Sequence, residues 1–127
     1  YSVIRHWLVP GGVSGFLAWH RGNQIVADCT VVSEKFILSG GNNFAANTEA
    51  LRIEGAMLGL RMSPIFQQRS DKSLVDDQVL KDHGLWVTGK EVGWEDGRDV
   101  NDAIIHGLVY LRRIRHLPTI RKYWPPK

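Results

Sequence analysis

Hydrophobic residues in the first third of the chain fall in short runs that glycine, proline and polar residues separate. β-prone residues fill 3–9, and a second run at 14–19 follows the Pro-Gly-Gly sequence at 10–12. Short apolar runs on either side of such a turn predict a β-hairpin. Runs at 25–27 and 29–32 predict further strands, and the uninterrupted apolar character of the latter is typical of a strand buried on both faces of a sheet.

The pattern changes to a helical period in the middle of the chain. Apolar residues recur at helical spacing after Thr48, a capping residue type, which predicts a helix over 48–61. A short strand is predicted at 65–67, and Ser70 then begins a second helix that ends at Gly84. The alternation of strands and helices predicts an α/β fold.

The last predicted helix, after a loop over 88–97, has the most informative polar residues. Asp99, Asp102 and His106 are three and four residues apart, so they share one stripe of the helix. The opposite stripe has the spacing of a face packed on a core: Ile104, Ile105, Leu108, Val109 and Leu111. Carboxylates on the exposed edge of a packed helix, followed by a basic segment, suggest a divalent cation held against phosphates. Alternatively, Asp99 lies in the first turn only because carboxylates stabilise a helix N-terminus.

Composition limits the class of protein. With 127 residues and 43% hydrophobic content, the chain suits one globular domain with a core. No apolar run approaches the roughly 20 residues needed to cross a bilayer, so no membrane association is expected. The single cysteine, Cys29, excludes a disulfide framework, fits a reducing compartment, and is expected to pack as a small hydrophobe.

Positive charge is concentrated at the C-terminal end, although the formal net charge of the chain is only +3. From residue 112 onward the chain has no acidic residue and six basic ones: Arg112, Arg113, Arg115, Arg121, Lys122 and Lys127. This one-signed segment, interleaved with aromatic residues, predicts contact with a polyanion. Part of it is also explained by the preference of cations for the last turn of a helix. Pro118 and the Pro-Pro pair at 125–126 are expected to stop regular structure, leaving 118–127 as a basic C-terminal tail docked on a domain of residues 1–117.

Five segments resemble, in the correct order, motifs of the RuvC-like nucleases, in the small resolvase-like form typical of phages. The segment 9–16 resembles the turn of the first hairpin, and 31–36 resembles the strand that ends in the glutamate of that family. The segments 68–72, 80–86 and 101–106 resemble its later motifs, so the likeness spans nearly the whole chain.

The resemblance implies a ribonuclease H-like fold, a mixed α/β sheet flanked by helices. The family usually has another strand and helix in the interval that lies here between Trp19 and Cys29. That interval is short in this chain, so the fold is expected to be trimmed of one strand and one helix.

The resemblance also implies chemistry: two divalent ions, Mg²⁺ or Mn²⁺, that assist the hydrolysis of a phosphodiester bond. Carried over by position, the catalytic and metal-binding residues are Glu34, Asp99 and Asp102. His106 either orients a ligand or phosphate, or is a structural histidine within the helix packing. The residues expected to contact branched or double-stranded DNA are Lys35, Arg112, Arg113, Arg115, Arg121 and Lys122.

One position departs from the family. Val9 stands where the family has the first-strand aspartate, and valine can neither coordinate a metal nor accept a proton. Three hypotheses therefore stay open. The chain is a metal-dependent endonuclease that resolves branched DNA such as Holliday junctions, acting as a homodimer. Alternatively, it is a catalytically inactive relative that binds DNA or another phage protein, or a small α/β binding domain unrelated to nucleases. The expected location is the cytoplasm of an infected bacterium, or the virion if the role is structural.

Overall fold

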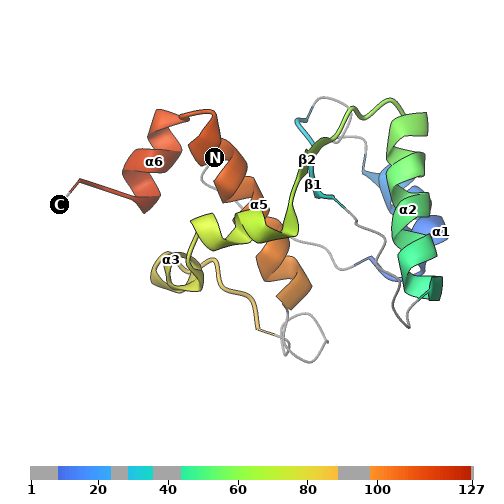
Figure 1. Ribbon diagram of the computed structural model, residues 1–127, viewed down its shortest axis with the longest axis horizontal. Helices are drawn as coiled ribbons and strands as arrows, with labels where there is room; N and C mark the ends of the chain where they lie inside the picture. Colours follow the sequence, from blue (N-terminus) through green and yellow to red (C-terminus); the bar gives the residue numbers. More distant parts are fainter. Residues whose placement is uncertain (1–8, 24–28, 36–43, 89–97, 127) are drawn as a thin grey trace. The chain divides into compact units, whose positions relative to one another are not determined.

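The computed structural model describes residues 9–23, 29–35, 44–88 and 98–126, and the chain divides into two compact units. One unit is Val9–Phe66, and the other contains Gln67–Lys127. Helices predominate in both, and the two short strands β1 (Val32–Glu34) and β2 (Ile65–Gln67) pair as a parallel sheet (Figure 1). The predicted mixed α/β class is confirmed at this level.

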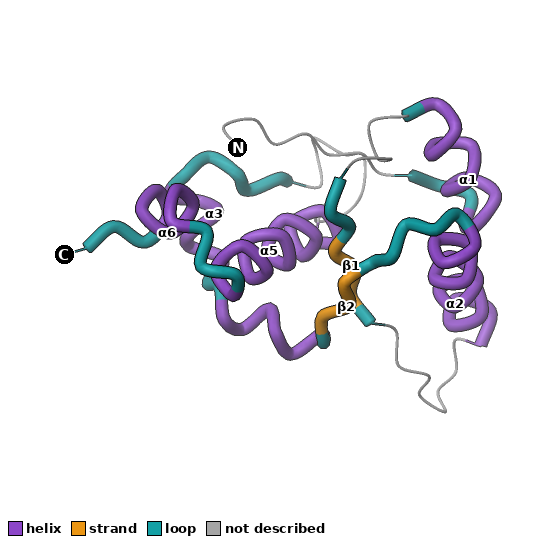
Figure 2. Tube along the Cα trace, turned by 90° about the horizontal axis from the view of Figure 1, so that it is seen from above, coloured by secondary structure: helices purple, strands orange, loops and turns teal. Residues whose placement is uncertain are grey.

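Two helices dominate the unit Val9–Phe66. Helix α1 (Gly12–Gly22) and helix α2 (Phe44–Gly59) pack side by side (Figure 2). The predicted hairpin is therefore wrong over 14–19, which is helical, while its other arm, 3–9, lies outside the described residues. The apolar residues of α1 also have helical spacing, and the Phe16 ring lies 6.3 Å from the Trp19 ring one turn later.

Tertiary contacts at its N-terminus favour the helical form of α1. Gly11 has a φ of 90°, a left-handed conformation that glycine adopts at little cost, and it lets the chain turn into the helix. The Val13 backbone N–H donates to the Glu49 carboxylate of α2, which satisfies a free donor of the first turn. A carboxylate from a residue distant in sequence thus supplies the cap that α1 itself lacks.

The remaining predictions in this unit are partly confirmed. The predicted strand at 65–67 is β2, and its first residue donates a 2.8 Å hydrogen bond to the Val31 carbonyl beside β1. Helix α2 begins at Phe44, so Thr48 lies inside it and does not cap it. Cys29 is exposed, which contradicts the expectation that it packs in the core, and the predicted strand at 25–27 lies outside the described residues.

The second unit is built on helix α5 (Arg98–Arg113). A 3₁₀ helix, η2 (Arg69–Leu74), precedes helix α3 (Asp77–Asp82), where one continuous helix is predicted. The break falls at Val75, which is extended, because Asp76 accepts a hydrogen bond from the Gln78 N–H and so starts a new helix. Gly84, with a φ of 68°, follows α3 as predicted.

The core of this unit lies between α5 and its neighbours. Its buried residues are Val75, Leu80, Ile105, Leu108, Val109 and Tyr123. Of the predicted packing face of α5, Ile104 and Leu111 are only partly buried, whereas Val100, Asn101 and His106 are buried.

The C-terminal segment continues in regular structure. Residues Leu117–Tyr123 form helix α6, and Pro118 lies in its first turn, where a missing N–H costs no hydrogen bond. The expectation that Pro118 stops regular structure is therefore wrong. Tyr123 belongs to the core cluster, so α6 docks on α5.

The start of α1 provides a stability test. A Cβ on Gly15 would lie 1.8 Å from the Pro10 carbonyl oxygen, so Gly15→Ala should force the backbone apart and destabilise the protein by at least about 2 kcal/mol. Gly55, in α2, has open space around its Cβ position, so Gly55→Ala should stabilise by about 0.5–1 kcal/mol. Urea unfolding of both variants measures the free energy of unfolding. Equal changes in this free energy would contradict the close approach at Gly15.

Candidate functional site

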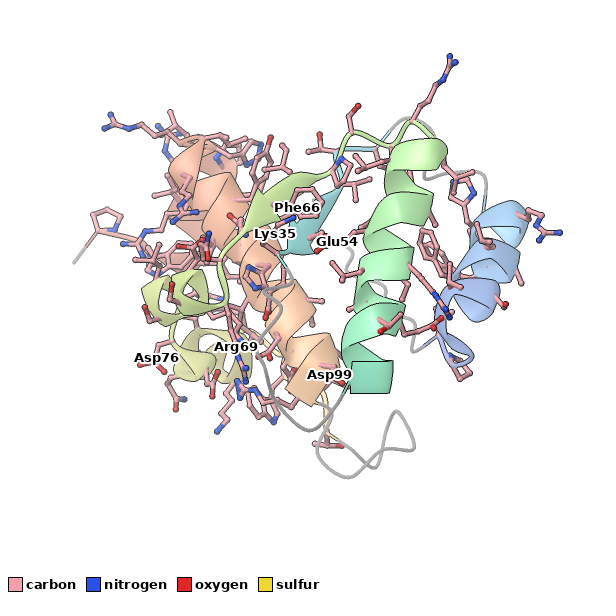
Figure 3. The ribbon with its side chains drawn as sticks, turned by 45° about the vertical axis from the view of Figure 1, so that its right-hand side comes forward. Lys35, Glu54, Phe66, Arg69, Asp76 and Asp99 are labelled. Atoms are coloured by element: carbon pink, nitrogen blue, oxygen red, sulfur yellow. The ribbon has the colours of Figure 1, made fainter. Side chains whose placement is uncertain are left out.

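The two aspartates of α5 lie one helical turn apart in different surroundings. Asp99 is exposed in the first turn (Figure 3). Asp102 is largely buried and pairs with two cations, Lys72 Nζ at 2.8 Å and Arg98 Nε at 3.0 Å. Each oxygen of the Asp102 carboxylate therefore accepts a charged hydrogen bond.

Arg98 extends this cluster to α3. Its two terminal nitrogens donate to both oxygens of Asp77, at 3.0 and 3.1 Å, while its Nε binds Asp102. Its guanidinium also lies 5.6 Å from the centre of the Trp86 ring, and Lys81 Nζ lies 4.6 Å from the same ring. One arginine thus joins α3 and α5 through a planar group that suits paired carboxylates.

Electrostatics favour the ionised form of Asp102. Burial alone would raise the pKa of its carboxyl, but the hydrogen bonds and charges of Lys72 and Arg98 outweigh this and lower the pKa. Carboxylate oxygens are ligands that Mg²⁺ and Mn²⁺ prefer, so Asp99 and Asp102 have suitable chemistry. A metal at Asp102 would have to displace Lys72 or Arg98, whereas at Asp99 the structure describes no competing cation.

His106 faces the interior of the second unit. It is 3% exposed, and Gln67 Nε2 donates to its carbonyl oxygen at 2.8 Å and lies 3.1 Å from its Nδ1. The Gln67 amide nitrogen can only donate, so it faces two acceptor positions of His106 in this arrangement. These contacts support the structural alternative for His106, because they fix the histidine against Gln67.

Glu34, Lys35 and Val9 belong to the other unit, which is described by itself. Glu34 is the last residue of β1 and is partly buried, and Val9 lies in the coil before α1. Lys35 pairs with Glu54 of α2 at 3.3 Å, and its Nζ lies 4.8 Å from the Phe66 ring centre (Figure 3). Lys35 thus has intramolecular partners within its unit.

Two of the predicted DNA-contacting arginines, in the last turn of α5, also have partners within the chain. Arg113 donates to both oxygens of Asp71, at 2.8 and 3.2 Å. Arg112 lies 4.6 Å from the Trp124 ring centre and donates to the Leu74 carbonyl oxygen at 3.1 Å. Arg112 therefore joins the end of α5 to the end of α6.

The Asp71 carboxylate serves two purposes. The hydrogen bond from Arg113 lowers the pKa of Asp71, and the hydrogen bond from the Gln68 N–H acts in the same direction. The latter bond, 2.6 Å long, belongs to the capping box of η2. Asp71 thus starts η2 and fixes it to α5.

Three predicted cations have a different environment. Arg115, Arg121 and Lys122 are exposed, and within the described residues none lies within ion-pair distance of an acidic side chain. Lys122 does contact the Tyr123 ring, at 5.3 Å from its centre. Lys127 lies outside the described residues.

The described residues contain no group of three or more His, Cys, Asp and Glu side chains that could hold a metal ion. The sequence analysis also missed the cations that pair with Asp102. The spacing of four residues between Arg98 and Asp102 could have indicated one pair, since such residues are neighbours on a helix. No local signal indicates Lys72, thirty residues earlier.

Comparison with models of protein families, with curated protein sequences and with solved structures finds no match. Within the described ranges, no helix is both long enough and apolar enough to cross a membrane.

The ion pairs of Asp102 predict a pH-dependent stability. Its pKa is lowered on folding, so the stabilisation is fully present above the ordinary pKa of aspartate, about 4, and is lost as pH falls through the lower folded value. Asp102→Asn should cost about 1–2 kcal/mol at pH 7, and less as the pH falls below 4. Thermal unfolding between pH 7 and pH 2.5 measures the difference. The control is Asp99→Asn, at an exposed aspartate of the same helix. An equal pH dependence of the stability loss in this control would contradict the prediction.

Proposed function

We propose that this protein is a RuvC-like, divalent-metal-dependent endonuclease of branched DNA with a ribonuclease H-like fold, in which Val9 weakens catalysis. The residues assigned to metal binding are Asp99, Asp102 and Glu34, and the partner is branched or double-stranded DNA bound by a homodimer. When bound, Mg²⁺ or Mn²⁺ supplies activation of water and stabilisation of the leaving oxygen.

One observation carries the proposal: α5 has an acidic start and a basic end on a helix fixed by its buried face. Asp99 is exposed at the start, and Asp102 follows one turn later. Arg112 and Arg113 in the last turn have partners within the chain, and Arg115, two residues after the helix, is exposed. A metal-dependent nuclease needs carboxylates that bind the cation and basic side chains that bind phosphates.

A second candidate function is that of a catalytically inactive relative that binds DNA. Two observations favour it. Val9 cannot bind a metal, and the Asp102 carboxylate already holds Lys72 and Arg98, so its charge is balanced without a metal. In this candidate the ion pairs of Asp102 have a structural role and only the cations contact DNA.

Restoring the missing carboxylate distinguishes the two functions. We expect the unaltered protein to cleave a labelled four-way junction, but not linear duplex, with Mg²⁺ or Mn²⁺, and Val9→Asp to cleave it roughly tenfold faster or more. Cleavage by Val9→Asp alone would favour the inactive relative, as would junction binding without cleavage by either protein. If neither protein bound or cleaved the junction, both functions would be contradicted.

The metal role of Asp99 has a separate test. Asp99→Asn should abolish metal-dependent cleavage and leave junction binding unchanged, with only a small fall in Tm, because its exposed carboxylate contributes no more than about 0.3–1 kcal/mol at the helix N-terminus. The matched control is Asp82→Asn, an exposed aspartate whose described hydrogen bond is to Gln78 of the same helix. Equal cleavage by the Asp99 variant and the control would remove Asp99 from the metal site.

A further inference from the structure

Three helices end in the same hydrogen-bonded motif. In each, a residue with positive φ follows the helix, and the next N–H donates to a carbonyl five residues earlier, which is the Schellman arrangement. The residue with positive φ is Gly84 after α3, Arg61 after α2 and Arg115 after α5, with φ of 68°, 58° and 56°. The donor–acceptor pairs are Leu85 to Leu80 at 2.8 Å, Met62 to Met57 at 3.1 Å, and His116 to Leu111 at 2.9 Å.

Glycine is the residue that fits this position without strain. A Cβ makes the left-handed conformation unfavourable, so Arg61 and Arg115 each hold a backbone strain that Gly84 avoids. A strained residue that persists indicates either a local compensation or a function of its side chain. The local compensation would be the attraction of a cation to the C-terminal end of the helix dipole, and it applies equally to both arginines.

The surroundings of the two arginines differ. Arg61 is the single charged residue between 55 and 68. Arg115 lies in a segment from 112 onward that has only basic charges, and it follows Arg113, whose guanidinium is already bound by Asp71. Arg112 is likewise engaged, with Trp124 and the Leu74 carbonyl.

The arginines at this end of α5 therefore have two different roles. Arg112 and Arg113 fix the last turn of α5 to α6 and η2. Arg115 is exposed directly beyond this fixed turn, and the structure describes no acidic side chain within ion-pair distance of it. Its five N–H donors are arranged to bind two phosphate oxygens at once.

We propose that Arg115 is a phosphate-contacting residue of the DNA interface, held in a strained backbone conformation on the fixed end of α5. The inference rests on the proposed DNA-binding function, which it deepens by separating Arg115, as the contact, from Arg112 and Arg113, which are engaged within the chain. Arg112 and Arg113 are positioning residues for this contact.

The test is Arg115→Gly. If Arg115 contacts a phosphate, this substitution should raise the stability of the protein and weaken its binding of DNA. Glycine relieves the strain, so the Tm should rise by about 2–4 °C. Loss of one phosphate contact should weaken binding of a four-way DNA junction roughly 3–10-fold and reduce the slope of log K against log salt by about one. Arg115→Lys keeps the charge and the strain, so its salt slope should stay close to that of the unaltered protein.

The matched control is Arg61→Gly, which removes the same charge and the same strain from another helix end. We expect a similar rise in Tm with unchanged binding and salt slope. Equal weakening of junction binding by both glycine variants would overturn the inference, because the loss of binding would then reflect net charge alone. Unchanged binding by Arg115→Gly, with the unaltered protein binding the junction, would also overturn it. Absence of binding by the unaltered protein would instead overturn the proposed function, and this inference with it.

Discussion

Burial of one face of α5 is the constraint on which the second unit depends. Ile105 and Val109 lie one turn apart and are almost fully buried, and η2, α3 and α6 all pack on this helix. Leu80 of α3 and Tyr123 of α6 complete the same core. Burial of each large apolar side chain contributes about 1.5–3 kcal/mol, which makes this cluster the main source of stability for a small unit. With this face buried, the rotation of α5 is fixed, and so is the exposed position of Asp99.

Charge is arranged around α5 in a way that both stabilises the helix and supports the proposed function. Acids at the start and cations at the end each interact favourably with the helix dipole. Arg98 of α5 and Lys72 of η2 compensate Asp102, and Asp71 of η2 compensates Arg113. The pairs of Lys72 and Asp71 hold η2 against α5, and the Arg98–Asp77 pair holds α3 against it. Exposed charges for which the structure describes no ion pair include Asp99 at one end and Arg115, Arg121 and Lys122 beyond the other.

The unit Val9–Phe66 depends on polar contacts between segments more than on a large core. The Glu49 carboxylate of α2 receives the Val13 N–H of α1, and Lys35 after β1 pairs with Glu54 of α2. Among its described residues, Met57 is the buried hydrophobic one, and Leu51 and Leu58 of α2 are exposed. The charge of Glu49 thus contributes to the choice between helix and strand for residues whose apolar pattern allows either.

The sequence by itself determined the features that depend on local periodicity and capping. It predicted α5 with its aspartates at the start and its cations at the end, and the glycine after α3, because neighbouring residues decide both. It also predicted the short strand at 65–67, although the pairing of that strand with β1 is a contact with residues distant in sequence. The tertiary structure alone decided that 14–19 is a helix, and that the docked C-terminal segment is helical and buries Tyr123. It also decided that Lys72 neutralises Asp102 and that His106 faces Gln67. Each of these depends on residues distant in sequence, whose packing and charge outweigh the local preference of the chain.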